Sequence, residues 1–254
     1  MASVAERRAA FRALHQSGIF VLPNPWDAGG ARRLAKLGFP ALASTSWGAA
    51  AAMGLSDYQL TRDMVLAHLA MLVEATDLPV NADFEAGFAD APDEAAANAV
   101  MAAATGVAGL SIEDRTGGDL YPFDLAVERI RRVRAALDPD VMLIARTEAY
   151  LVGRPDLDET IRRMTAFAEA GADCLYAPGM SDLGEIARLV RAVAPKPVNV
   201  LLWGDAFSVA DLAAIGVRRA STGGALAKAA WDGFDAAAAA LAAQAKDGSA
   251  SLSA

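Results

Sequence analysis

The stretch PVNADFEAGFADAPDEAAANAVMAAATGVAGLSIED, residues 79–114, decides the fold. It opens and closes with a short apolar run that ends in acidic residues, at 79–85 and 109–114, and a longer helical pattern fills the gap. Such a strand–helix–strand unit is typical of a parallel sheet, because parallel neighbours need a long crossover connection. The unit therefore predicts an α/β fold.

The same alternation continues outward in both directions. Candidate strands lie at 19–24, 41–46, 79–85, 109–114, 141–147, 174–178, 197–202 and 218–223. Eight units in a chain of 254 residues favour closure into a (β/α)8 barrel of the TIM type. An open, doubly wound sheet would expect a GxGxxG turn after its first strand, and NPWDAGGA at 24–31 does not fit that pattern. We expect a single barrel domain at 1–246 and a frayed polar tail at 247–254.

Composition narrows the class of partner. Hydrophobic residues make up 54% of the chain, and the net charge is −8. Scattered basic residues in an acidic chain make nucleic acid and anionic membranes poor partners. The single cysteine, Cys174, excludes an internal disulfide and a cysteine zinc site. The charged N-terminal stretch does not read as a signal peptide, and no apolar run reaches the ~20 residues that span a bilayer. We expect a cytoplasmic protein that acts on a small molecule.

Acidic residues gather at the ends of two neighbouring candidate strands. Active sites of (β/α)8 barrels lie at the C-terminal ends of the strands. Asp83 and Glu85 close the third strand on one side of it, because side chains alternate along a strand, and the same alternation turns Glu113 into the barrel. Three buried carboxylates repel one another unless they share a cation, and oxygen ligands favour Mg²⁺ or Mn²⁺. The alternative is that each acid caps a helix or pairs with a surface Lys or Arg.

Arg146 closes the fifth candidate strand on the same side as Glu148. A guanidinium group binds a carboxylate or phosphonate through two parallel hydrogen bonds, so Arg146 is the expected anion clamp. The alternative is a structural salt bridge to Glu148, and the two roles are compatible.

These strand ends belong to a longer series of motifs. In order, they are TSWG (45–48), GLSD (54–57), NADFEAGF (81–88), GLSIEDR (109–115) and IARTEAY (144–150). Together they resemble the isocitrate lyase/phosphoenolpyruvate mutase superfamily, whose members include phosphonomutases and methylisocitrate lyases, from about Asn24 to Ala229. The resemblance implies a Mg²⁺-dependent enzyme that forms a pyruvate enolate from a small α-keto or α-hydroxy acid, with Mn²⁺ as the alternative metal.

The resemblance also implies a role for each site residue. Thr45, Ser46 and Trp47 match a turn whose N–H groups and hydroxyl hold a substrate carboxylate. The expected catalytic residues are Asp57, Glu113 and Arg146, where Asp57 orients metal-bound water or substrate and Arg146 also binds substrate. Asp83 matches the direct metal ligand, Glu113 the acid of the IED motif, and Glu85, where the family more often has Asp, would reach the metal through water. Asn199 lies near a position that contacts substrate in relatives.

One loop departs from the pattern that this resemblance implies. The family's lyases carry a loop of Lys-Arg-Cys-Gly-His type after the IED motif, and its phosphonomutases carry Lys and Asn there. Here residues 115–123 read RTGGDLYPF, without Cys, Lys, His or Asn. Ala177-Pro178-Gly179 also replaces a glutamate of the lyases. Isocitrate or methylisocitrate cleavage is therefore not expected, and decarboxylation of oxaloacetate or chemistry on phosphonopyruvate-type substrates needs least from the loop. Gly117 and Gly118 make it a candidate lid, or an ordinary flexible turn.

Two other functions stay open at this point. A barrel that kept the metal site and lost the loop chemistry would bind a ketoacid without turning it over. Alternatively, Ser221-Thr222-Gly223-Gly224 after the last strand resembles the phosphate-binding turn of barrel isomerases.

The alanine-rich stretch at 224–245 predicts a last helix that can pack closely against another. The family often exchanges this helix between subunits, which implies a homo-oligomer, either a dimer or a tetramer.

Overall fold

The computed structural model describes residues 2–204 and 206–251. Its parallel sheet contains eight strands in the order β1-β10-β9-β8-β7-β4-β3-β2. They are β1 (Phe20–Leu22), β2 (Leu42–Ala43), β3 (Val80–Asp83), β4 (Gly109–Glu113), β7 (Met142–Arg146), β8 (Cys174–Tyr176), β9 (Val198–Leu201) and β10 (Arg219–Ser221). Each falls inside a predicted strand. The Ala43 N–H donates to Pro23 O (3.0 Å) across the seam between the first two strand segments, so the sheet curls into a nearly closed barrel.

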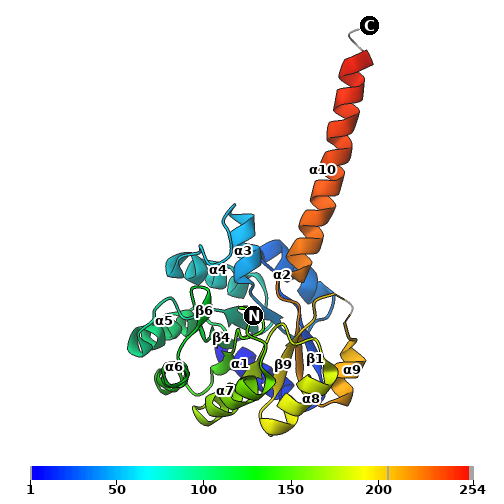
Figure 1. The fold of residues 1–254 in the computed structure, drawn as a ribbon. Coiled ribbons are helices and arrows are strands. Elements are labelled where there is room, and N and C mark those ends of the chain that lie inside the picture. Colours follow the sequence, from blue (N-terminus) through cyan, green and yellow to red (C-terminus); the bar gives the residue numbers. More distant parts are fainter. Residues whose placement is uncertain (1, 205, 252–254) are drawn as a thin grey trace.

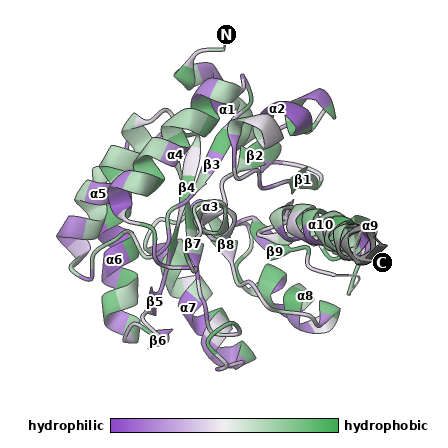
Figure 2. Cartoon of the chain, turned by 90° about the horizontal axis from the view of Figure 1, so that it is seen from above, coloured by the Kyte–Doolittle hydropathy of each residue, from purple (hydrophilic) through white to green (hydrophobic). Residues whose placement is uncertain are grey.

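Helices surround the strands when the molecule is viewed along the barrel axis (Figure 2). They are α1 (Val4–Leu14), α2 (Ala28–Lys36), α3 (Ser46–Ala52), α4 (Arg62–Ala75), α5 (Pro92–Ala104), α6 (Phe123–Ala136), α7 (Leu157–Glu169), α8 (Leu183–Ala192), α9 (Val209–Ala214) and α10 (Ala225–Ser251). Asp27, Asp156 and Asp182 each accept a backbone N–H at the start of α2, α7 and α8. The side-chain caps explain why these helices begin directly behind their βα loops. The predicted TIM-type barrel is confirmed.

The core lies in two layers. A large apolar cluster fills the space between strands and helices, and a smaller one fills the N-terminal end of the barrel, where Phe11 of α1 is fully buried against the start of β4. Cys174 is buried in this second cluster, and burial raises the pKa of its thiol to about 11. Cys174 therefore acts as a small packed residue of the core.

Helix α10 leaves the barrel at the C-terminal end of β10 and projects well beyond it (Figure 1). It continues to Ser251, into the range where a tail was expected, and residues 252–254 lie outside the described part of the chain. Within the described residues, no helix has the length and apolar character needed to cross a bilayer.

Candidate active site

Asp83, Glu113 and Arg146 are the last residues of β3, β4 and β7, which are neighbours in the sheet. Glu113 pairs with Arg146 in the β4–β7 register. The Arg146 guanidinium lies between the acids, with Nη1 3.4 Å from Asp83 Oδ1 and Nε 3.6 Å from Glu113 Oε2. Its Nε also donates to Glu148 Oε1, so the predicted pairing with Glu148 is present as well. Strand register therefore brings the predicted acids and the predicted anion clamp to one point.

Glu85 lies in the same region, but its backbone does not continue the strand as predicted. The strand ends at Asp83 rather than at residue 85, and Glu85 adopts a left-handed backbone conformation with φ of 47°. Tyr58 (φ 62°) and Phe88 (φ 58°) are the other non-glycine residues of the described chain with positive φ. All three line one cavity. A left-handed non-glycine residue costs about 1 kcal/mol or more, and such strain concentrates at functional sites.

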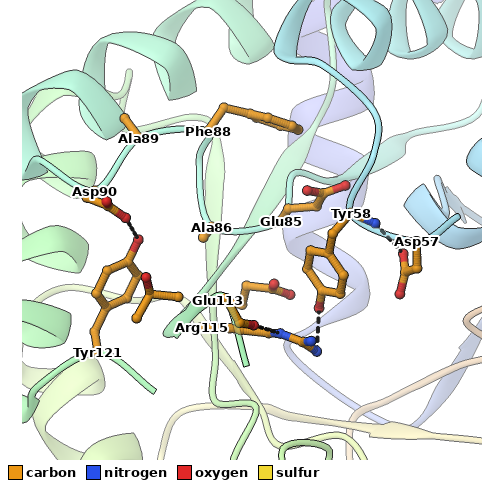
Figure 3. Close-up of a pocket in the computed structure, with 12 residues that line it drawn as sticks. Asp57, Tyr58, Glu85, Ala86, Phe88, Ala89, Asp90, Glu113, Arg115 and Tyr121 are labelled. Carbon is orange, nitrogen blue, oxygen red and sulfur yellow. Dashed lines mark hydrogen bonds between the residues drawn. The ribbon is translucent and has the colours of Figure 1, made fainter. Parts of the chain in front are cut away.

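Two connected cavities open at this end of the barrel. The first, here called the acidic cavity, has a volume of about 600 Å³ and contains Glu85, Asp90, Arg115 and Tyr121 (Figure 3). The second, the arginine cavity, has a volume of about 170 Å³ and contains Arg146, Asp83 and the segment 45–47. Asp57, Tyr58 and Glu113 line both. With the exception of Asn199, the predicted substrate and metal residues thus surround a single two-part space.

Burial disfavours the charged form of two carboxylates in this space, Glu85 and Glu113. Burial raises the pKa of Glu85 to about 8, and the charges of Asp83 and Asp57 add to the rise. Burial also raises the pKa of Glu113 well above its ordinary value, although Arg146 acts in the opposite direction. Glu85 Oε1 and Glu113 Oε1 are buried without a hydrogen-bond partner. Because buried acceptors are normally satisfied, the two orphaned oxygens indicate that a further positive group or donor belongs here.

A hydrated divalent cation fits these donors. No group of three His, Cys, Asp or Glu residues within the described ranges converges closely enough to enclose a bare ion. Mg²⁺, however, usually keeps several waters and takes only one or two carboxylates directly. The donor set of Asp83, Glu85 and Glu113, with two unpartnered oxygens, suits such an ion.

The predicted carboxylate-binding turn at 45–47 is occupied by the protein itself. Ser46 donates both its N–H and its hydroxyl to Asp83 Oδ2, each at 2.9 Å. Thr45 caps α3 by accepting the Gly48 N–H. Trp47 forms a wall of the arginine cavity against Gly224, where a Cβ would lie 2.5 Å from the indole. The turn therefore orients Asp83 and shapes the cavity.

Comparison with known proteins settles the family. The family model for phosphoenolpyruvate phosphomutase matches residues 11–242. This chain belongs to that family. It lies within the wider isocitrate lyase/phosphoenolpyruvate mutase superfamily, as its motifs predicted, and its homologues are lyases and phosphonomutases. The chain is accordingly an enzyme of this type. A solved structure of phosphonopyruvate hydrolase in complex with oxalate and Mg²⁺ matches its fold with a TM-score of 0.84 at 23% identity.

Three relatives show how close the similarity is. A crystal structure from Burkholderia cenocepacia J2315, provisionally described as a lyase/mutase, matches with a TM-score of 0.90 and 50% identity over 93% of this chain and 88% of that one. An uncharacterised Mycobacterium tuberculosis protein is 36% identical over 84% of this chain and 81% of its own length. The oxaloacetate decarboxylase of Ectopseudomonas mendocina is 31% identical over 80% of this chain and 73% of its own.

The loop in which this family member departs from the lyases forms a hairpin. Strands β5 (Arg115–Thr116) and β6 (Asp119–Leu120) pair antiparallel. The Arg115 guanidinium stacks 4.2 Å from the centre of the Tyr58 ring, and its Nη1 donates to the Tyr58 hydroxyl at 3.3 Å. Tyr121 is instead fixed away from the reacting groups by its hydrogen bond to Asp90. The hairpin thus presents Arg115 to the site and holds Tyr58 in place.

Tyr58 was missed by the sequence reasoning. Its hydroxyl donates to Glu148 Oε2 at 3.4 Å while accepting from Arg115. The available signal was its position directly after Asp57 of the GLSD motif, but a loop tyrosine carries no periodicity that would turn it inward. Burial raises its pKa well above the ordinary value, with the charges of Glu113 and Glu148 acting in the same direction. The hydroxyl therefore keeps its proton.

Two sequence-predicted features lie apart from this cluster. Asn199 on β9 is buried, donates to Ser221 Oγ at 2.9 Å, and lines neither cavity among the described residues. The proposed site therefore omits it. The 221–224 turn has its N–H groups engaged, because Asn24 Oδ1 accepts from Thr222 N (3.0 Å) and Gly223 N (2.9 Å). This engagement, together with the family, argues against the phosphate-binding alternative.

Proposed function

We propose that the chain is a Mg²⁺-dependent lyase that forms the enolate of a 2-oxo acid, with decarboxylation of an oxaloacetate-type substrate as its simplest reaction. One observation carries the proposal. Arg146, Asp83 and Glu113 meet at a small cavity that fits a three- or four-carbon acid. Glu113 there and Glu85 in the adjoining acidic cavity each have an unpartnered, buried oxygen. Mn²⁺ could replace Mg²⁺ on the same oxygen donors.

Each residue acts on a different part of the substrate. Asp83, Glu85 and Glu113 would hold the metal, with Ser46 fixing the Asp83 carboxylate. The bound metal would supply Lewis-acid stabilisation of the oxygen that becomes negative. The Arg146 guanidinium would pair with the substrate carboxylate, and Glu148 keeps that guanidinium in its plane. Asp57 lines both cavities and would orient substrate or water.

The electron pair of the broken bond and one proton must then be accounted for. When the bond between carbons 3 and 4 breaks, carbon dioxide leaves and the electron pair passes to the 2-oxo oxygen as an enolate. Carbon 3 needs one proton to give the 2-oxo acid product. We infer that the Tyr58 hydroxyl gives it, because Tyr58 borders both cavities and the hairpin offers no Cys, Lys or His. Arg115 would stabilise the phenolate until water in the acidic cavity returns the proton.

Turnover tests the proposal. Purified protein with Mg²⁺ is offered oxaloacetate, phosphonopyruvate and methylisocitrate, and pyruvate release is measured after subtraction of the rate with metal alone. We expect release from oxaloacetate, lost with EDTA and in Asp83→Ala, and retained in the control Asp140→Ala, whose side chain is exposed far from the site. Release from methylisocitrate alone would contradict the proposal.

The absence of Cys, Lys and His from the 115–123 loop favours one second candidate, a non-catalytic ketoacid-binding barrel. That protein would be stabilised by oxalate or pyruvate with Mg²⁺ and would turn over no substrate. The same assay with a thermal-shift measurement distinguishes the two functions.

A further inference from the structure

A third cavity adjoins the arginine cavity and shares none of its acidic lining residues. This apolar chamber has a volume of about 420 Å³ and lies between the loops that follow β7, β8 and β9. Its main lining residues are Leu151, Gly179, Met180, Leu201, Trp203 and Phe207. Three of them, Leu151, Leu201 and Trp203, also line the arginine cavity, so the two spaces are continuous.

We propose that the apolar chamber receives a hydrocarbon substituent on carbon 3 of the substrate, an inference that rests on the proposed function. The substrate class is then a 2-oxo acid that carries both a carboxylate and an alkyl or aryl group on carbon 3, and loss of carbon dioxide gives a 2-oxo acid longer than pyruvate.

The chemistry of the lining supports this occupant. None of the described residues that line it is charged, and Ser181 is the only one of them with a hydroxyl. Cavities that bind small molecules combine a few convergent polar groups with largely apolar walls. Here the two properties are divided, with Arg146 and the acids in the small cavity and apolar side chains in the larger one. A substrate that fills both would place its carboxylate on Arg146 and a hydrocarbon group in the chamber.

Exposure at the junction gives a second argument. Leu151 and Trp203 are 48% and 49% exposed, although both line the passage between the cavities. Large apolar side chains that face a polar binding site gain free energy when a hydrocarbon group covers them. Contact with a substituent would remove this surface from water.

Gly179 keeps the chamber open. Its φ is 90°, and a Cβ there would lie 2.9 Å from Tyr150 Cβ and 3.0 Å from Leu151 Cδ2. A side chain at this position would push Leu151 across the passage. The glycine therefore suits both the backbone conformation and the space beside it.

Binding of straight-chain 2-oxo acids tests the proposal. Affinities of oxalate, pyruvate, 2-oxobutanoate, 2-oxopentanoate and 2-oxohexanoate are measured by calorimetry on the full chain with Mg²⁺. We expect Kd to fall about three- to fourfold for each added methylene group, the usual gain from burying one. Oxalate and pyruvate, which do not reach the chamber, set the baseline.

Two variants address the chamber alone. Phe207→Ser removes apolar wall, and Ala206→Asp adds a charge, and neither residue lines the other two cavities. Each variant should abolish the dependence on chain length and leave the Kd for oxalate within twofold of wild type. The matched controls, Leu37→Ser and Ala9→Asp, change exposed residues outside the three cavities and should behave as wild type.

Three outcomes would overturn the proposal. The first is oxalate binding with no gain from chain length, as when a second copy of the chain covers the chamber, and it leaves the proposed function intact. The second is a gain that persists in both variants, because the hydrocarbon then binds elsewhere. Failure of every acid to bind, oxalate included, would remove the proposed function and this proposal together.

Discussion

Tyr58 shows what a single residue supplies when a loop lacks the expected acid. Its ring lies under Arg115 and its hydroxyl contacts Glu148, in a backbone conformation that costs free energy. A structural tyrosine would not need that conformation at the border of two cavities. The placement is what makes it the candidate proton donor.

Replacement of Tyr58 by Phe removes the hydroxyl and leaves the ring. If the hydroxyl protonates carbon 3, kcat should fall by about 10²–10⁴-fold, the usual contribution of a positioned acid. The Kd for oxalate should stay within about threefold, because the carboxylate contacts remain. Tyr150→Phe is the matched control, since Tyr150 also donates to a carboxylate, Glu185, but lines none of the three cavities. Equal losses in both variants would assign Tyr58 a structural role.

The raised pKa of Glu85 predicts a pH dependence for the metal-free protein. The folded carboxyl holds its proton to about pH 8, whereas the unfolded one, with an ordinary pKa of 4.5, has lost it. The folded state then binds more protons, so the free energy of unfolding falls as pH rises, by up to ~1.4 kcal/mol per pH unit for one such group. Glu113 acts in the same direction.

Between about pH 6.5 and 8, the contribution of the buried carboxyl groups to stability can be measured apart from that of His15. Burial lowers the pKa of His15 to about 3, which makes stability rise with pH, but only below the ordinary histidine value of 6.5. Urea unfolding in EDTA should therefore show declining stability across the window, a shallower slope in Glu85→Gln, and a gain with Mg²⁺ that grows with pH. A flat profile in the wild type would contradict the assignment.

At the scale of elements, β4 and α7 are held together at the edge of the site. Asp114, the residue after β4, accepts from Arg163 Nη1 at 3.1 Å and from the Glu148 N–H at 2.9 Å. The Arg163 side chain is 8% exposed, while that of Arg162 beside it is 53% exposed. Both arginines also pair with Glu159. The two neighbours thus share Glu159 but differ in burial and in the additional ion pair of Arg163 with Asp114.

Removal of each arginine should have very different costs. Arg163→Met leaves the buried Asp114 carboxylate without its charged partner and should lower the free energy of unfolding by about 3–5 kcal/mol. Arg162→Met removes an exposed pair and should cost about 1 kcal/mol or less. Denaturant midpoints of the two variants provide the comparison. Losses within 1 kcal/mol of each other would show that Asp114 finds other partners.

The eight strands were predictable because their apolar runs are short, regular and separated by helical patterns. The alternation of side chains along a strand also predicted which way Glu113 and Arg146 point, because both lie inside strands whose register is fixed by neighbouring strands. The same alternation could not predict the orientation of Glu85, because this residue lies past the end of the strand in a left-handed turn. The β5–β6 hairpin and the position of Tyr58 depend on contacts between loops that are distant in the sequence. The local sequence pattern does not predict such contacts.

At the scale of the whole molecule, α10 is poorly suited to a single chain in water. It projects from the barrel (Figure 1), and Phe234 and Leu241 on it are 63% and 67% exposed. These residues are seven apart, so they share one face of the helix. A contact with a second copy would bury that face, in keeping with the homo-oligomer and the helix exchange predicted from the sequence.

Light scattering should therefore give the mass of a dimer or a tetramer, and the face of α10 should control it. The double variant Phe234→Glu with Leu241→Glu should lower the mass towards the monomer, because burying two carboxylates at an interface is costly. The control double variant, Ala236→Glu with Ala243→Glu, places the same charges about 200° around the helix and should keep the wild-type mass. Circular dichroism confirms that both remain folded. A monomeric wild type would contradict the prediction, and equal loss in both variants would show that the interface is not confined to this face.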